Sequence, residues 1–301
     1  MMNRTTVFLA VAFVLLWNSG FIGAEYGLPY TGPFTLLFWR YLVLTLVVFL
    51  YLIVRRRFHW VGWRIAAANM LIGVLAHGVW LTCVLLALDN QVPAGVVALV
   101  VALQPLLTGA LSPMVVGERT TTYQWIGLVL GFLGVFITVL FRIDFDNSSS
   151  VFGYLIPLGS VIGITIASLI QRQIDIRNSS RKLPMDLTLF YQSFATTLAL
   201  ALPAIFIEQL STQWEPEFIY TMIWLIFAVS LGAYALMWIL IDRIEATRVA
   251  SFFYLGPPVT MVMAWLIFDD KVQTMDITGL VVVFIGVILT QYNNEKYHFK
   301  S

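Results

Sequence analysis

The sequence predicts an all-α integral membrane protein. We expect ten transmembrane helices, arranged as two inverted five-helix repeats, with both termini in the cytoplasm. Three observations lead to this prediction. The chain is 60% hydrophobic and only 11% charged. It contains a series of long apolar runs joined by short links. Its two halves also match each other when one is laid over the other with a shift of 152 residues.

Ten apolar runs are long enough to be membrane spans. A helix of about 18 or more apolar residues crosses the roughly 30 Å of hydrocarbon in a bilayer. The predicted spans are 7–24, 33–54, 65–88, 93–115, 122–141, 151–171, 185–207, 217–241, 247–268 and 275–292. The links between them are short and rich in proline and glycine, so no separate soluble domain is expected. The first run has no clear small-residue cleavage site, so we interpret it as a span and not as a signal peptide.

The positive charges indicate how the spans are oriented, because cytoplasmic loops carry an excess of Lys and Arg. With the N-terminus inside, 14 of the 17 Lys and Arg residues fall in cytoplasmic segments. Only Arg142 and Lys271 fall outside, and Arg40 lies within a span. Both termini are therefore predicted to be cytoplasmic. The cytoplasmic set is Arg4, Arg55, Arg56, Arg57, Arg64, Arg119, Arg172, Arg177, Arg181, Lys182, Arg243, Arg248, Lys296 and Lys300.

The internal match predicts an inverted repeat. A gapless shift of 152 residues places Pro105 on Pro257, Thr108 on Thr260 and Gly127 on Gly279. The halves 1–150 and 151–301 each hold five predicted spans, an odd number, so the second half must enter the bilayer from the opposite side. Such a duplication offers two near-equivalent states, one open to each side of the membrane, which is a mechanism for alternating access.

Charged and polar residues inside the spans are the first candidates for a binding site, because a charge at a helix centre costs about 2.5–3.5 kcal/mol. Arg40 lies about 10 Å of helix rise into the second span. It is predicted to contact an anion or carboxylate or a helix-end carbonyl, or else to tie its span to another. His77 is a protonation switch, a substrate hydrogen-bonder, or a neutral histidine with satisfied hydrogen bonds. Trp80 lies one turn further on.

Two matched proline sites indicate a binding site or hinge at mid-membrane. Gln104-Pro105 lies at the centre of the fourth span, and Gly256-Pro257-Pro258 lies at the equivalent place in the ninth. Proline removes a helical hydrogen bond and bends the helix. Single prolines are common in membrane helices and often have no such role, but the symmetric pairing favours hinges at Pro105 and Pro257.

Aromatic and polar residues in the middle of other spans suit a cavity for an amphipathic or aromatic solute. The alternative is that such aromatics face lipid, as most of them must in this chain. Ser230, Tyr234 and Trp238 form a stripe on the eighth span. The predicted substrate-binding residues are Trp17, Asn18, Arg40, His77, Trp80, Gln104, Tyr234, Trp238 and Tyr254.

The chain has few of the residues that an intramembrane enzyme would need for catalysis. The chain has three histidines, two of them (His59 and His298) in predicted loops, and a single cysteine, Cys83. No metal site, catalytic residue or cofactor is expected. No carboxylate lies in the middle of a span, which favours a facilitative carrier or coupling through His77 or Glu25. A channel would show rings of like residues around a pore, and the kinked internal repeat fits a carrier better.

Several motifs resemble the EamA-type transporters of the drug/metabolite transporter superfamily, and the resemblance covers essentially the whole chain. They are Trp17-x-Ser19, Arg40, the block from Gln104-Pro105 to Gly117-Glu118-Arg119, and Trp125-x-Gly127 with Gly131 and Gly134. The second half repeats this block with Pro257 and Gly279, but has Asp269-Asp270 where the family usually shows Gly-Glu.

The resemblance implies a ten-helix inverted repeat. It also implies a cavity lined by the first, third, fourth, sixth, eighth and ninth helices, and export of small metabolites, amino acids and related compounds included. Export of drugs, purines or sugars on the same fold is the alternative. The expected partners are a small-molecule substrate and the lipid bilayer, without nucleic acid. We expect a monomer or weak homodimer in a cell membrane, the bacterial inner membrane in particular.

Overall fold

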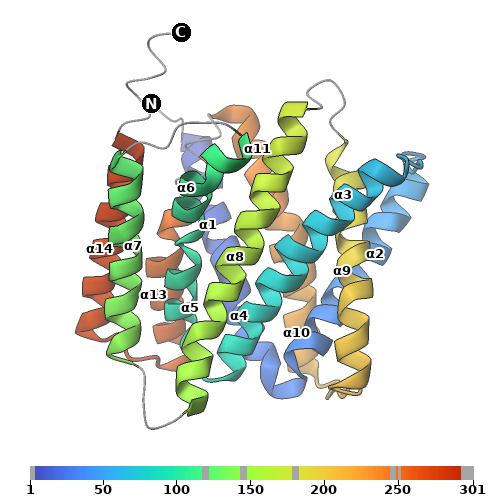
Figure 1. Ribbon diagram of the computed structural model, residues 1–301. Coiled ribbons are helices and arrows are strands. Elements are labelled where there is room, and N and C mark those ends of the chain that lie inside the picture. The colour runs from blue at the N-terminus through green and yellow to red at the C-terminus, as the bar shows by residue number, and fades with distance from the viewer. Residues whose placement is uncertain are drawn as a thin grey trace.

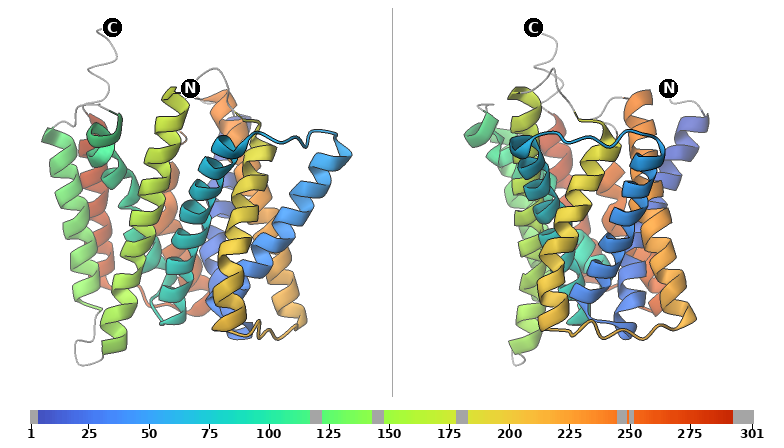
Figure 2. Two further views of the ribbon diagram at one scale, coloured as in Figure 1. Left: turned by 45° about the vertical axis from the view of Figure 1, so that its right-hand side comes forward. Right: turned by 90° about the vertical axis from the view of Figure 1, so that its right-hand side faces the viewer.

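The structure is a computed structural model that describes residues 4–116, 122–142, 148–177, 183–244, 249 and 252–292. In this part of the chain every regular element is a helix, apart from an isolated antiparallel bridge between Thr31 and Thr212. The helices run roughly along one common direction and form a bundle (Figures 1 and 2). The prediction of an all-α protein is confirmed.

The helices follow one another with short connections. The first half contains α1 (Arg4–Gly27), α2 (Pro33–Val54), α3 (Trp63–Gly73), α4 (Trp80–Asp89), α5 (Ala94–Val101), α6 (Gln104–Val116) and α7 (Thr122–Leu140). The second half contains α8 (Ser148–Arg177), α9 (Met185–Phe206), α10 (Pro216–Ile223), α11 (Tyr234–Arg243), α13 (Gly256–Phe268) and α14 (Thr274–Tyr292). Single 3₁₀ turns are formed by η1 (Leu28–Tyr30) and η4 (Phe253–Leu255).

Seven helical segments are long and apolar enough to cross a membrane: Arg4–Tyr30, Pro33–Val54, Trp63–Asp89, Ala94–Pro113, Val151–Ile176, Met185–Phe206 and Pro216–Ile241. They correspond to seven of the predicted spans. Three shorter apolar helices, Trp125–Leu140, Phe253–Phe268 and Thr274–Leu289, lie within the other three predicted spans. The start of the ninth predicted span, at residues 247–251, lies outside the described residues except for residue 249.

Both proline sites coincide with breaks in a helix. The chain leaves the helical path at Ala102 and Leu103, and α6 then begins with Pro105 in its first turn. In the second half, η4 gives way to α13, whose first turn holds Pro257. Proline suits this position because its fixed φ fits a helix and the N–H it lacks has no helical partner there.

Two segments of wide, π-helical backbone interrupt the third and eighth predicted spans. They are η2 (Val74–Val79) between α3 and α4, and η3 (Trp224–Ala233) between α10 and α11. The shift of 152 residues places the first segment inside the second. Long runs of π-helix are rare and occur frequently at functional sites. Nothing in the sequence pattern predicted them.

The main packing contacts join segments that match in the repeat. Helix α2 packs against its mate α9, and α7 packs against its mate α14, whereas α5 packs against α13, whose own mate in the repeat is α6. Several other contacts come in matched pairs: α1 lies against α10, η3 and α11, and its mate α8 lies against α3, η2 and α4. Thr45 and Thr197, which are 152 residues apart, meet with their hydroxyl oxygens 3.3 Å apart between α2 and α9.

Glycines allow α7 and α14 to approach closely. A methyl group at Gly134 would overlap the carbonyl of Gly279, and one at Gly286 would overlap the carbonyl of Gly127. These two contacts are equivalent under the shift of 152 residues. Small residues at such crossings are typical of membrane helix pairs, in which the backbones come into contact.

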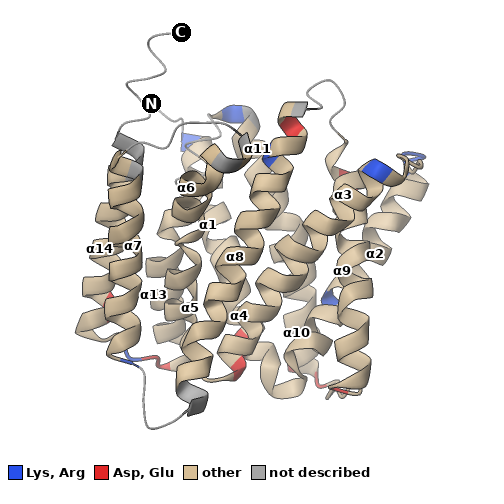
Figure 3. Ribbon diagram, viewed as in Figure 1, with Lys and Arg blue, Asp and Glu red and all other residues tan. Residues whose placement is uncertain are grey.

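Charged residues gather at the two ends of the bundle, and the band between them is almost free of charge (Figure 3). One end carries the start of α1, the turn with Arg55, Arg56 and Arg57, and the end of α8. At the other end Arg142 forms an ion pair with Asp276. Arg119, Arg181, Lys182, Arg248, Lys296 and Lys300, which contributed to the predicted orientation, lie outside the described residues.

Candidate functional site

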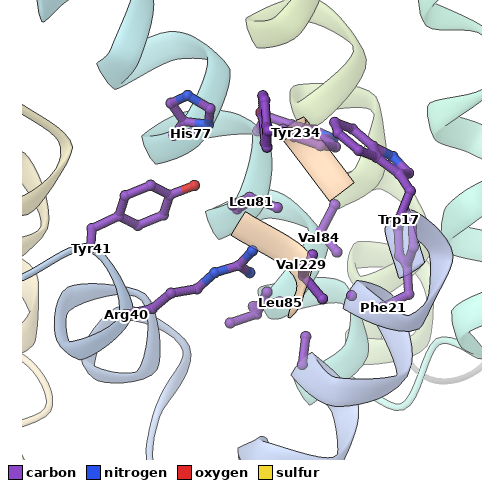
Figure 4. Close-up of a pocket in the computed structure, with 13 residues that line it drawn as sticks. Trp17, Phe21, Arg40, Tyr41, His77, Leu81, Val84, Leu85, Val229 and Tyr234 are labelled. Carbon is purple, nitrogen blue, oxygen red and sulfur yellow. The ribbon is translucent and has the colours of Figure 1, made fainter. Parts of the chain in front are cut away.

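A pocket opens where α1, α2, η2 and α4 of the first half meet η3 and α11 of the second half (Figure 4). Its empty volume is about 500 Å³, with the open mouth included. The pocket therefore adjoins both π-helical segments and is built by both halves of the chain.

Five of the nine predicted binding residues line this pocket: Trp17, Arg40, His77, Trp80 and Tyr234. They come from five different elements, and only His77 and Trp80 are close in the sequence, one helical turn apart. Bringing them together is a property of the tertiary structure, since the sequence only placed each one near the middle of its span.

Aromatic rings form one wall of the pocket. The rings of Trp17 and Trp80 are stacked, with centroids 6.3 Å apart and an interplanar angle of 19°. The ring of Tyr234 lies 5.2 Å from that of Trp17, and Phe253 meets Trp17 edge-on at 5.0 Å from outside the pocket lining. The indole nitrogen of Trp80 is buried and has no hydrogen-bond partner among the described residues.

Arg40 supplies the positive charge of the pocket. It is only 5% exposed. Its Nε and Nη2 groups donate to Ser230 Oγ at 3.0 and 2.9 Å, which ties α2 to η3. The guanidinium carbon also lies 5.9 Å from the ring centroid of Tyr41. Within the part of the chain that the structure describes, no carboxylate forms an ion pair with Arg40. Arg40 therefore ties its helix to another segment, as one alternative had it, while its contact with an anion or carboxylate stays a prediction.

His77 links the pocket to α9. Its Nε2 lies 3.2 Å from Gln192 Oε1. Because an amide oxygen only accepts, Nε2 donates in this contact. The ring also lies 5.5 Å from that of Tyr41 and 6.1 Å from that of Tyr234. Gln192 matches Arg40 in the repeat, so the mates on α2 and α9 each reach a π-helical segment of the other half, η3 and η2.

Four predicted binding residues lie away from this pocket. Asn18 is buried, donates to Val14 O at 2.7 Å and accepts from Thr260 at 3.2 Å, which joins α1 to α13. Gln104 donates to Thr108 and Ser168, at 3.1 and 3.2 Å. Trp238 is 37% exposed. The fourth residue, Tyr254, is partly buried and packs against the apolar cluster around Leu99 and Leu103.

Several lining residues were not predicted. Phe21, Leu81, Val84, Leu85 and Val229 are ordinary apolar side chains, and no local signal separates them from other core residues. Tyr41 is different, because it follows Arg40 directly and carries a polar group in the middle of a span. Its hydroxyl points into the pocket (Figure 4). A polar side chain in the middle of a span, directly after Arg40, could have identified Tyr41 as a pocket residue.

The described residues contain no group of three His, Cys, Asp or Glu side chains that could hold a metal ion. The polar groups of the pocket instead come from one arginine, one histidine, two tyrosines and two indoles. This set can hold a polar or anionic group and stack against a flat apolar one.

Comparison with known proteins places this arrangement in a family. Residues 4–140 and 151–292 each match the EamA-like transporter family. The "Uncharacterized transporter YvbV" of Bacillus subtilis (strain 168) is 27% identical over 203 residues, 66% of this chain, and the match spans 64% of that protein. The "Probable amino-acid metabolite efflux pump" of Escherichia coli (strain K12) is 23% identical over 97% of this chain and 96% of its own length.

A solved structure described only as "Crystal structure of protein" has a similar fold. It superposes with a TM-score of 0.64 at 17% identity, over 97% of this chain and 98% of that one. At this identity the likeness shows the fold alone. The family match and the apolar helices identify a multi-pass membrane protein, and the named relatives are transporters and not enzymes. The chain belongs to the EamA-like transporter family.

Proposed function

We propose that this chain exports small metabolites, amino acids or related compounds, from the bacterial cytoplasm by alternating access. Its halves, 1–150 and 151–301, would be inverted five-helix repeats that give ten spans with both termini cytoplasmic. The pocket between the halves would bind the solute, and rocking of the halves about Pro105 and Pro257 would expose it to each side in turn.

Matched contacts support the inverted repeat. The pairs α2 with α9 and α7 with α14 each join segments 152 residues apart. A two-fold axis in the membrane plane would produce such self-pairing, because it exchanges every span with its mate. The meeting of Thr45 with Thr197 fits a position on that axis.

The observation that carries the transport mechanism is the pocket itself. It is lined by both halves and adjoins the two matched π-helical segments. Relative movement of the halves would therefore change the access to the pocket directly. The helix breaks at Pro105 and Pro257 lie in corresponding spans, and discontinuous helices at matched positions are typical of transporter sites.

The relatives support the substrate class. The Escherichia coli relative is named as a "Probable amino-acid metabolite efflux pump", and it aligns over nearly the whole chain. The aromatic wall of Trp17, Trp80 and Tyr234 suits solutes with apolar or aromatic bodies.

Counterflow in proteoliposomes tests the proposal. Vesicles that hold purified full-length protein and an unlabelled solute are diluted into the same solute in labelled form, across a panel of amino acids with aromatic members. We expect saturable accumulation of at least one amino acid. Trp17→Ala and Tyr234→Ala should weaken half-saturation by about fivefold or more, since aromatic contacts contribute about 0.5–1.5 kcal/mol beyond their buried area.

Trp265→Ala and Tyr220→Ala are the matched controls, because these side chains are 54% and 71% exposed and lie outside the pocket. They should leave counterflow unchanged. Flux that neither saturates nor shows counterflow would indicate a channel and refute the carrier mechanism. Counterflow of purines, sugars or drugs, but of no amino acid, would keep the carrier and overturn the substrate class.

A further inference from the structure

Arginine and tryptophan side chains in the pocket can only donate hydrogen bonds. Arg40 carries five N–H donors and no acceptor, and an indole nitrogen only donates. Trp80 is only 7% exposed, and its Nε1 atom is buried without a hydrogen-bond partner among the described residues. A ligand that satisfies these donors must bring acceptors into the pocket.

The positive charge of Arg40 has no acidic counterpart among the described residues that line the pocket. The thirteen lining residues include Arg40 and no Asp or Glu. Two of the guanidinium nitrogens share one hydroxyl oxygen, Ser230 Oγ, as their acceptor. Arginine stays protonated in proteins, and a buried charge without a counter-charge is costly. An anionic group entering beside Arg40 would therefore lower the free energy of the site.

The planar fork of the guanidinium matches a carboxylate, which can accept two parallel hydrogen bonds. Tyr41 lies beside this fork, and its hydroxyl is directed toward the same hollow (Figure 4). A carboxylate at this position would leave the rest of the ligand among the Trp17, Trp80 and Tyr234 rings.

An ammonium group finds no charged partner. Because no lining residue is acidic, a positive ligand group would have only ring faces, neutral oxygens and the neutral Nδ1 atom of His77, and it would be repelled by Arg40. Cation–π contacts would offset only part of that repulsion, since they contribute about 0.5–2 kcal/mol. The pocket should thus discriminate ligands by the sign of their charge.

We propose that the pocket binds its ligand through a carboxylate on Arg40, with a flat apolar body between the aromatic rings, and that an α-ammonium group is dispensable. This inference rests on the proposed transport function and specifies its substrates as small aromatic carboxylates, with or without an amino group. It predicts that deaminated acids are ligands as good as amino acids or better.

Four compounds that share one ring separate the two charges. Binding to the purified full-length chain is measured by isothermal titration with L-phenylalanine, 3-phenylpropionate, L-phenylalaninamide and phenethylamine. We expect 3-phenylpropionate to bind at least as tightly as phenylalanine. The amide and the amine, which lack the carboxylate, should bind about tenfold more weakly or worse, as expected for the loss of hydrogen bonds to a charged group.

Arg40→Gln should bring the four affinities together, because it removes the charge that distinguishes the compounds. Arg64→Gln is the control: it removes an equal charge from an exposed site at the start of α3 and should preserve the order. If Arg40→Gln does not fold, the wild-type series still decides. Equal or tighter binding of the amide or amine, or charge selectivity that survives Arg40→Gln, would overturn the inference.

Failure here differs from failure of the proposed function. If none of the four compounds binds, the aromatic-carboxylate ligand is refuted. Saturable counterflow of any other solute in the wider panel would then still establish a carrier. If the acids bind but no solute shows counterflow, the ligand class stands and the transport function fails.

Discussion

Buried polar residues in this bundle serve two different purposes. Asn18, Gln104 and Thr45 make hydrogen bonds that join helices, and they lie outside the pocket lining. Arg40 and His77 also join helices, but they line the pocket as well. In hydrocarbon an unsatisfied polar group is costly, so protein partners for Arg40 and His77 stabilise the pocket when no ligand is present.

Asp270 is a residue at which stability should depend on pH. It follows α13 at the end of the bundle, outside the spans, and its Oδ2 atom is buried without a hydrogen-bond partner among the described residues. Burial raises the pKa of this carboxyl, and the positive charge of Arg142 opposes part of the effect. A raised pKa means that the folded state holds the proton more tightly than the unfolded state, so ionisation of Asp270 destabilises the fold.

We therefore expect Asp270→Asn to raise the melting temperature near pH 8, by about 1–3 °C for a change of this kind. The advantage should shrink as the pH falls through the raised pKa and vanish near the ordinary aspartate pKa of about 3.9. Thermal unfolding in detergent between pH 4 and pH 8 measures this difference in melting temperature.

Asp269→Asn is the control, because it removes the same charge from a neighbouring exposed residue and should change the melting temperature little. A constant difference between wild type and Asp270→Asn at every pH would contradict this account.

At the scale of the elements, the irregular parts of the helices occur in pairs. The π-helical segments η2 and η3 and the breaks before α6 and α13 all lie in matched positions of the two halves. The proline breaks follow from covalent chemistry and were predicted. The π-helical segments hold His77 and Ser230, whose partners lie on α9 and α2, and no local sequence signal predicted them.

The close contact between α7 and α14 should make the stability of the protein sensitive to side-chain size at Gly279. Gly279→Ala should destabilise the protein by about 1–3 kcal/mol, as is usual for overpacking, because its methyl group would overlap Thr138 Oγ1 and the carbonyl of Gly134. Thermal unfolding in detergent measures the effect. Gly109→Ala in α6 is the matched control, since no atom lies within 4 Å of a methyl group placed there. Equal stability of the two variants would show that α7 and α14 are further apart than described.

At the scale of the whole molecule, the orientation in the membrane can be tested by thiol labelling. The single native cysteine, Cys83, is first replaced by serine. A cysteine at Ser211, in the exposed loop after α9, should react with an impermeant maleimide in intact cells. A cysteine at Arg56, in the basic turn after α2, should react only after the cells are permeabilised. The reverse pattern would place the termini outside and contradict the predicted orientation.

Much of this protein follows from the sequence alone. Apolar runs determine where helices form, because a helix satisfies its own backbone hydrogen bonds in lipid. Matching residues such as Pro105 and Pro257 indicated the duplication and the helix breaks. Arg40, His77, Trp17, Trp80 and Tyr234 could be selected as pocket residues because aromatic and polar groups stand out in an apolar span.

Only the tertiary structure decided which polar residues share a pocket. Asn18 and Gln104 look as suitable as Arg40 in the sequence, yet their side chains turn toward Thr260 and Ser168 on neighbouring helices. Apolar lining residues such as Leu81 and Val229 are recognisable only once the helices are packed. The pocket results from the way the two halves meet, and the rotation of each helix about its axis is determined by contacts between residues far apart in the chain.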